Sequence, residues 1–311
     1  MRITAPKPRD AILFLTQNPR MAKIGTRYGM RLGAGRFVAG VTLEDCIAEL
    51  HALAGRGLRT YTIMLGESVA SAAEADRVTA AYVDVIDRLG AEGSLDNTMS
   101  IKLTHIGLLS DRELAHDNAV RVLEAARRAG MFVRLDMEDS RHVDATLDVH
   151  ERLLADGLTN TGVVVQAYLH RAPELLAALT EMRANVRIVK GAYLEPASVA
   201  LPRKEDVDRA YCRLVDAALA GEGFTAIATH DDAMIAHAER TLAGSRAAAE
   251  GRYEFQLLYG VRPQLQQALV DRGHPVRVCV PFGSDWYVYF GRRLAERPAN
   301  LWFVVRSMVR R

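Results

Sequence analysis

The chain has 311 residues, of which 49% are hydrophobic and 25% charged, so it can bury a core of ordinary globular composition. Its 40 basic side chains nearly balance its 38 acidic ones, and the net charge of +2 excludes a dedicated nucleic-acid-binding protein. The three cysteines are far apart and lack CxxC spacing. This argues against a disulfide framework or a structural zinc site and favours a reducing compartment.

No apolar run is long enough to cross a membrane, since a spanning helix needs about 20 predominantly apolar residues. Near the start, the only apolar run covers residues 11–15, which is too short for a signal-peptide core. We therefore expect a cytoplasmic protein, with peripheral contact at the inner face of the membrane left open.

The first part of the chain, residues 1–57, is expected to form an N-terminal helical arm or lid. It includes the amphipathic stretch TLEDCIAELHALAGRG at 42–57. Residues 58–311 are expected to form one catalytic domain, because no Pro/Ser-rich linker or low-complexity segment divides them.

From residue 58 onward, short β-branched or apolar runs alternate with longer stretches of helical periodicity. The predicted strands are 58–65, 99–103, 132–136, 162–168, 186–190, 224–229, 253–258 and 276–280. Helical stretches between them include 71–90, 111–130, 172–185 and 203–223. This alternation predicts an α/β fold, a (β/α)8 barrel of the TIM type. An open doubly wound sheet is the competitor, disfavoured because no glycine-rich dinucleotide motif follows the first strand.

Polar residues gather at the predicted strand ends, where barrel enzymes carry their reactive groups. They are Lys102, Asp136, Gln166, Arg187, Lys190, Thr229 and His230. Taken singly, each has a structural explanation, such as an outward-facing strand residue, a helix cap or a buried amide. Together, the cations predict a cleft that attracts a carboxylate or a pyrophosphate. Gly191 and Ala192 would let the backbone approach a large flat or phosphorylated ligand.

The stretch YFGRRLAE at 289–296 contains adjacent arginines behind a tyrosine and ahead of a glutamate. If this stretch is helical, Tyr289, Arg292, Arg293 and Glu296 share one side of the helix. Two guanidinium forks suit a planar carboxylate. The alternative is an ordinary ion pair on a solvated helix surface.

On the residues alone, three other functions stay open. A Schiff-base aldolase would use Lys102 or Lys190 as its nucleophile. A metal-dependent hydrolase would use Asp136, Glu138 and His230, but a second well-placed histidine is hard to find. The third is a barrel that only binds anions, or a scaffold without chemistry.

An ordered set of motifs resembles the proline dehydrogenases, including the proline dehydrogenase domain of bifunctional proline-utilisation enzymes. The motifs are SIKL, RLDMED, VVQAYL, VRIVKGAY, ATHD, YEFQLLYG and YFGRRLAE. The resemblance implies a distorted (β/α)8 barrel that binds FAD non-covalently, needs no metal and oxidises L-proline to 1-pyrroline-5-carboxylate, the first step of proline catabolism to glutamate. It further implies a quinone as electron acceptor and is compatible with coupling to a pyrroline-5-carboxylate dehydrogenase.

The resemblance also implies residue roles. Substrate-binding residues would be Lys102, Leu258, Cys279, Tyr289, Arg292, Arg293 and Glu296. FAD-binding residues would be Met137, Gln166, Arg187, Lys190, Gly191, Ala192, Thr229 and His230. Asp136 and Arg187 would be the catalytic pair, with Asp136 ordering the polar network beside the substrate and Arg187 near flavin N5. No metal-binding residue is implied.

Two positions depart from the usual family pattern. Cys279 stands where most members have a tyrosine of the substrate pocket, and Asp231 replaces a common asparagine. Cysteine is smaller and lacks the phenol hydroxyl. We therefore expect weaker proline binding and tolerance of a 4-hydroxyl group on the substrate.

Overall fold

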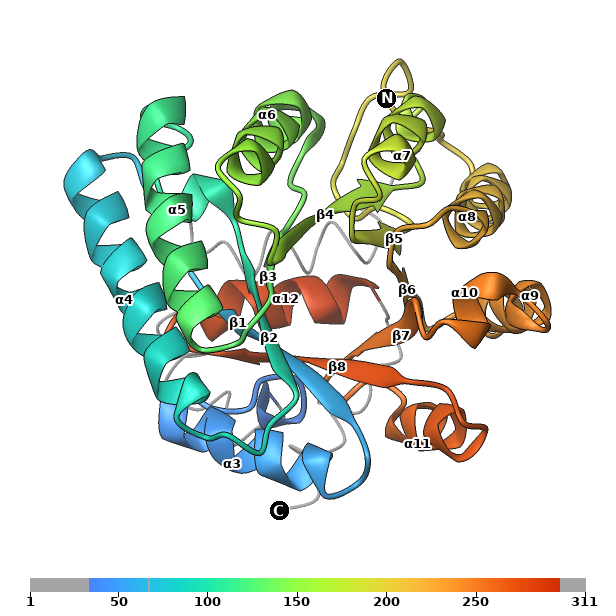
Figure 1. Ribbon diagram of the computed structural model, residues 1–311, viewed down its shortest axis with the longest axis horizontal. Coiled ribbons are helices and arrows are strands. Elements are labelled where there is room, and N and C mark those ends of the chain that lie inside the picture. The colour runs from blue at the N-terminus through green and yellow to red at the C-terminus, as the bar shows by residue number, and fades with distance from the viewer. Residues whose placement is uncertain (1–33, 67, 297–311) are drawn as a thin grey trace, which may run out of the picture.

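The computed structural model describes residues 34–66 and 68–296, with the side chains of the last helix described as far as Gly291. Within this part, eight parallel strands form a closed barrel in which each strand pairs with the next and the eighth pairs with the first. The strands are β1 (Arg59–Met64), β2 (Asn97–Ile101), β3 (Val133–Leu135), β4 (Thr161–Gln166), β5 (Val186–Val189), β6 (Thr225–Ala228), β7 (Tyr253–Leu258) and β8 (Val276–Phe282). The predicted (β/α)8 barrel is confirmed (Figure 1).

The strands differ from their predicted ranges only at their ends. β2 ends at Ile101, so Lys102 follows the strand instead of lying in it. β4 ends at Gln166, where the amide of Leu169 donates to the Gln166 carbonyl and closes a turn. β8 is longer than predicted because it keeps pairing with β1 through Met64. Apolar periodicity does not mark such ends, since pairing with a neighbouring strand decides them.

Helices α3 to α11 surround the barrel (Figure 1). They are α3 (Leu43–Ala54), α4 (Ala72–Gly90), α5 (Arg112–Arg128), α6 (Val143–Ala155), α7 (Ala172–Glu181), α8 (Lys204–Ala220), α9 (Asp232–Leu242), α10 (Arg246–Ala249) and α11 (Pro263–Asp271). Side chains cap several helix starts: Thr42 accepts a hydrogen bond from the Asp45 amide before α3. Such caps satisfy amides that have no partner within the helix.

The last helix, α12 (Trp286–Glu296), lies at the barrel end where the strands terminate, because Val288 and Tyr289 line the cavity there. It belongs to a small apolar cluster separate from the main core. The cluster consists of Ala34, Phe37, Val38, Val261, Trp286, Tyr289 and Phe290. The cluster joins the segment before α3 to the end of the described chain.

The boundary expected at residue 58 does not separate two cores. Cys46, Leu50 and Leu53 of α3 are buried in the main core of the barrel, together with Leu58. Residues 1–33 lie outside the described part of the chain. The helical arm assigned to residues 1–57, and the catalytic domain assigned to 58–311, therefore stay predictions.

Candidate active site

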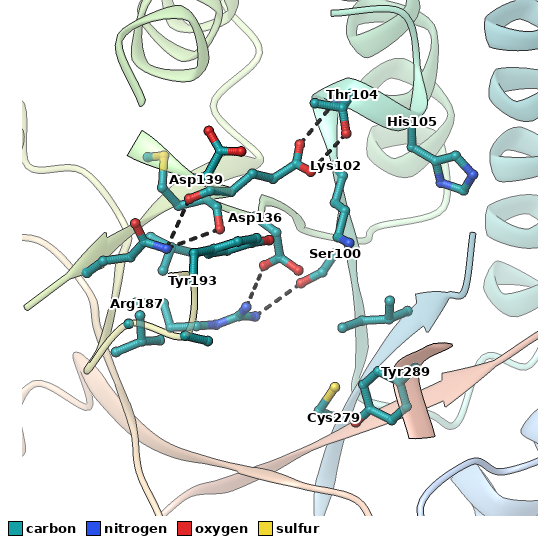
Figure 2. Close-up of a pocket in the computed structure, with 18 of the residues that line it drawn as sticks. Ser100, Lys102, Thr104, His105, Asp136, Asp139, Arg187, Tyr193, Cys279 and Tyr289 are labelled. Carbon is teal, nitrogen blue, oxygen red and sulfur yellow. Dashed lines mark hydrogen bonds and ion pairs between the residues drawn. The ribbon is translucent and has the colours of Figure 1, made fainter. Parts of the chain in front are cut away.

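A cavity of about 1180 Å³ opens at the C-terminal ends of the barrel strands. Thirteen sequence-predicted residues line it: Lys102, Asp136, Met137, Gln166, Arg187, Lys190, Gly191, Ala192, Thr229, His230, Leu258, Cys279 and Tyr289. Figure 2 shows polar side chains from several strands converging there. Because small-molecule pockets usually measure about 300–1,000 Å³, this cavity has room for a large ligand and a small one together.

The three remaining predicted residues lie at the end of α12. Arg292, Arg293 and Glu296 belong to this helix, as expected, but their side chains lie outside the described residues. Their part in the site therefore stays a prediction.

Arg187 of β5 is the centre of a buried polar network. Its Nη1 donates to Asp136 Oδ1 at 2.7 Å and its Nη2 to Ser100 Oγ at 3.1 Å. Its Nε donates to Gln256 Oε1 at 2.6 Å. The guanidinium carbon lies 4.4 Å from the centroid of the Tyr61 ring. Burial works against the charge, but Tyr61 and Asp136 bring the pKa of Arg187 above its ordinary value, so the group is a fixed cation.

The side-chain amide of Gln166, the last residue of β4, bonds to the loop that follows β3. Its Nε2 donates to the Glu138 carbonyl at 3.1 Å and reaches the Met137 carbonyl at 3.5 Å. Its buried Oε1 has no hydrogen-bond partner among the described residues. Because Gln166 lines the cavity, a ligand bound there could donate a hydrogen bond to this acceptor.

The loop after β2 is tied to the loop after β3. Thr104 donates its hydroxyl to Glu138 Oε2 at 2.8 Å. The adjacent His105 has its Nδ1 2.9 Å from the Tyr82 hydroxyl. Burial lowers the pKa of His105 to about 4, and nearby Lys102 acts in the same direction, so the imidazole is neutral near pH 7.

The two predicted lysines have different surroundings. Lys190 Nζ donates to Asp208 at 2.5 Å and to Asp231 at 2.9 Å. Although burial works the other way, hydrogen bonds from Lys190 lower the pKa of both carboxyl groups. Lys102 forms no hydrogen bond or ion pair within the part of the chain that the structure describes, and its side chain points into the cavity (Figure 2). Of the two charges, that of Lys102 is available to an anionic ligand.

Thr229 and His230 order the ends of neighbouring strands. His230 Nε2 accepts a hydrogen bond from the Leu258 amide at 2.9 Å, and Thr229 Oγ1 accepts one from the Asp231 amide at 3.1 Å. An accepting Nε2 leaves the ring proton on Nδ1 of a neutral imidazole. Among the side chains that the structure describes, which end at Gly291, no three His, Cys, Asp or Glu groups are placed to hold a metal ion. The hydrolase alternative therefore lacks a ligand set there.

Gly191 and Cys279 fit the cavity by being small. Gly191 has φ +108°, and a Cβ there would lie 2.2 Å from the Tyr168 ring, so only glycine is accommodated. Cys279 is fully buried on β8, and both it and Tyr289 line the cavity. Figure 2 also shows the Tyr193 ring, which the sequence left unassigned, extending into the cavity.

Sequence reasoning missed three residues that contact Arg187: Tyr61, Ser100 and Gln256. Ser100 lies two residues before Lys102, and Gln256 two before Leu258. Side chains two apart on a strand share a face, so this spacing could have found both. No comparable signal distinguishes Tyr61 from a core aromatic residue.

Comparisons with known proteins agree with this geometry. The family model "Proline dehydrogenase" matches residues 46–306. Proline dehydrogenase 1 of Bacillus subtilis (strain 168) is 40% identical over 303 residues, covering 97% of this chain and 99% of its own length. Proline dehydrogenase of Deinococcus radiodurans is 39% identical over 306 residues, covering 97% of this chain and 98% of its own length. This chain belongs to the proline dehydrogenase family. Family membership confirms the resemblance stated from the motifs and the expectation of an oxidoreductase.

Longer members of the proline dehydrogenase family share the fold. Bifunctional protein PutA of Escherichia coli (strain K12) is 29% identical over 326 residues, which cover 91% of this chain but 24% of that protein. The solved structure of proline utilization A from Bdellovibrio bacteriovorus matches with a TM-score of 0.78 at 19% identity, covering 94% of this chain and 40% of that one. At this identity the likeness supports the barrel fold alone.

Proposed function

We propose that this protein oxidises L-proline to 1-pyrroline-5-carboxylate with FAD held non-covalently in the cavity. Membership of the proline dehydrogenase family supports the reaction. The observation that carries the cofactor assignment is the buried Gln166 Oε1, which has no partner among the described residues. The isoalloxazine ring offers an N–H donor on its polar edge, and this acceptor fits it. When bound, FAD supplies the hydride acceptor.

The rest of the cavity also fits a flavin. Arg187 is a fixed cation that lines the cavity and would stabilise the negative charge that reduction places on a flavin beside it. Gly191 lines the cavity with its backbone, because the Tyr168 ring leaves no room for a side chain there. The other expected cofactor contacts are Met137, Lys190, Ala192, Thr229 and His230, which line the same cavity. Lys190 is already paired with two carboxylates, so we assign it to ordering the loop and not to a direct phosphate contact.

Substrate binding follows from the charges. Lys102, together with Arg292 and Arg293, would hold the proline carboxylate. This clamp is supported by the position of Lys102 in the cavity, where its charge has no hydrogen bond or ion pair among the described residues. Glu296 would pair with the arginines when substrate leaves. Leu258 and Tyr289 line the cavity and would pack against the ring of proline. Such a clamp fixes the reacting carbon without acid–base chemistry.

Proton removal needs no strong base in this arrangement. The amine of proline must be neutral before hydride leaves, and the nearby cations Lys102 and Arg187 favour loss of its proton. Asp136 is bonded to Arg187 at 2.7 Å. We therefore assign Asp136 to holding the guanidinium in place.

Anaerobic titration of the purified protein tests the proposal. L-Proline should bleach the absorbance of bound oxidised flavin, whereas D-proline at the same concentrations should not. A protein that binds no flavin after reconstitution, or whose flavin stays oxidised with L-proline, would contradict the proposal. A borohydride-trapped lysine adduct without flavin would instead favour the aldolase.

Cys279 supports a wider substrate range. Its short side chain on β8 lines the cavity where a tyrosine would occupy more space. We propose that 4-hydroxyproline is accepted there. The ratio of kcat/KM for trans-4-hydroxy-L-proline to that for L-proline should fall in Cys279→Tyr, and an unchanged ratio rejects the idea.

The mouth of the cavity suits an apolar electron acceptor. Leu109, Leu194 and Val288 line it, with 50%, 76% and 39% of their surfaces exposed. No helix among the described residues is long and apolar enough to cross a membrane. We propose that electrons pass to a quinone during peripheral contact with the cytoplasmic side of the membrane. Leu194→Asp should then slow turnover with vesicle-embedded quinone but not with a water-soluble acceptor; equal rates would contradict this.

The product also suggests a partner. The PutA relatives, of which this chain matches about a quarter, are described as bifunctional. We propose that 1-pyrroline-5-carboxylate passes to a pyrroline-5-carboxylate dehydrogenase acting with this protein. A coupled assay should then show a shorter lag with the physiological partner than with an unrelated dehydrogenase of equal activity.

A further inference from the structure

Below the cavity, buried polar side chains lead from Arg187 to the opposite end of the barrel. Arg187 Nε donates to Gln256 Oε1 at 2.6 Å, and Gln256 Nε2 donates to Glu254 Oε1 at 2.7 Å. Arg277 Nε donates to both Glu254 oxygens, at 2.8 and 3.0 Å. Arg277 Nη2 then donates to Asp96, which precedes β2. The chain of hydrogen bonds therefore runs through the barrel interior along its length.

Strand geometry explains why β7 reaches Arg187. Glu254 and Gln256 are two residues apart on β7, so both side chains point into the barrel. Between β7 and β5 lies β6, whose Ala226 is paired in register with both Arg187 and Glu254. Because Ala226 has only a methyl group, the long Arg187 side chain can pass over β6 to Gln256.

The orientation of the Gln256 amide is fixed by its two neighbours. A guanidinium cannot accept a hydrogen bond, and a carboxylate cannot donate one. The amide oxygen must therefore face Arg187 and the amide nitrogen must face Glu254. Glu254, buried with 3% of its surface exposed, is in turn fixed by Arg277.

We propose that Gln256 is a positioning residue for Arg187, an inference that rests on the proposed flavin chemistry. Asp136 and Ser100 bond to the two terminal nitrogens of Arg187, and Gln256 bonds to Nε. Contacts at the terminal nitrogens alone let the guanidinium pivot, whereas the third contact fixes its plane. A fixed cation beside the flavin stabilises the reduced, negatively charged ring and so raises its reduction potential. Glu254 acts through Gln256 by holding the amide in one orientation.

Gln256→Met tests this, because methionine has similar length but no hydrogen-bonding amide. The reduction equilibrium of bound flavin, measured against a reference dye, should shift about tenfold toward oxidised flavin, or about 30 mV for a two-electron couple. In the same variant, kcat should fall about tenfold while KM for proline changes less than about threefold. Asn118→Leu is the matched control, since Asn118 is a buried amide that bonds the Ile106 carbonyl outside the cavity. It should lower Tm and leave the flavin potential unchanged.

A rescue variant separates positioning from packing. In Gln256→Glu an acceptor still faces Arg187, and a proton shared with Glu254 replaces the amide donor. Its kcat should stay within about threefold of wild type. The proposal is overturned if Gln256→Met keeps the wild-type flavin potential and kcat. It is also overturned if Gln256→Met and Gln256→Glu lose kcat equally and in proportion to their loss of Tm.

If Gln256→Met does not fold, Gln256→Asn tests the role of Gln256 in its place. The shorter asparagine amide cannot reach both Arg187 and Glu254, so the same shift in flavin potential and the same fall in kcat are expected. The dye measurement does not involve proline. A wild-type protein whose flavin ignores proline would therefore reject the proposed function, while the potentials would still decide the role of Gln256.

Discussion

Two cations that face the barrel interior at opposite ends, Arg277 and Lys102, have opposite surroundings. Arg277 bonds to Glu254, Asp96 and the Thr60 carbonyl. Lys102 lines the cavity and has no hydrogen bond or ion pair within the described residues. The contrast shows that a charge in this barrel can serve stability or be kept for a ligand. In TIM-type barrels the same division is expected between the N-terminal and C-terminal faces.

Replacing Arg277 should have the largest effect on stability. Arg277→Met leaves the buried Glu254 carboxylate with only the Gln256 amide and a 3.8 Å ion pair to Arg59, and breaking such a buried pair costs about 3–5 kcal/mol. Urea unfolding of the flavin-free protein would measure this loss. Arg171→Met is the matched control, because Arg171 is 47% exposed and pairs with the exposed Asp144, so its loss should stay below about 1 kcal/mol. Similar small losses in both variants would contradict the stabilising role of Arg277.

Replacing Lys102 should weaken substrate binding and leave stability nearly unchanged, the opposite of replacing Arg277. Lys102→Met should change the free energy of unfolding by less than about 0.5 kcal/mol, since no protein contact of the charge is lost. KM for proline should rise about 10- to 100-fold, equal to about 1.4–2.8 kcal/mol of charged hydrogen bonding. Steady-state kinetics at constant flavin content would measure it.

Lys190→Met is the control for Lys102, because it removes a lysine paired with Asp208 and Asp231. It should lower stability and leave KM for proline nearly unchanged. An unchanged KM in Lys102→Met would remove Lys102 from the clamp.

The sequence predicted the barrel and thirteen of the residues that line its cavity, but not how they pair. Lys102 and Lys190 look alike in sequence, each following a short apolar strand. They differ because Asp208 on α8 and Asp231 before α9 converge on Lys190, and no local pattern reveals such convergence. The alternation of strands and helices along the sequence was enough to predict β7. The hydrogen bond from Arg187 Nε to Gln256, however, depends on the small Ala226 that lies between them on β6. Periodicity thus predicts faces of elements, while long-range packing decides the partners.

Two buried amides extend the comparison to neutral groups. Gln166 at the cavity has an oxygen without a partner among the described residues, whereas the Asn118 amide, on α5, donates to the Ile106 carbonyl and accepts from Arg121 Nη1. Gln166→Leu should weaken FAD binding about fivefold to tenfold, the worth of one hydrogen bond. Fluorescence titration of flavin-free protein would show it. Asn118→Leu should lower Tm without changing the flavin Kd; equal flavin affinities in both variants would reject Gln166 as a cofactor contact.

The smallest expected effect is a loss of stability in acid from two buried histidines. Burial lowers the pKa of His105, at the cavity, and of His150, on α6, to about 4; Lys102 adds to the effect at His105 and Arg134 at His150. Since an unfolded histidine titrates near about 6.5, each neutral ring contributes stability that is complete above this pH and is lost as pH falls toward 4. By pH 5.5 each should have cost about 1 kcal/mol relative to pH 7.

His150→Phe should remove one of these contributions, because it deletes a titrating ring whose Nε2 is buried without a hydrogen-bond partner among the described residues. The difference in unfolding free energy between pH 7 and pH 5.5 should shrink by about 1 kcal/mol. Lys102→Met should reduce the same difference only slightly, since burial is the larger cause at His105. Urea unfolding at the two pH values, with NMR titration of the histidine rings, would separate the two. If His150→Phe leaves the pH difference unchanged, His150 is not among the groups that lose stability in acid.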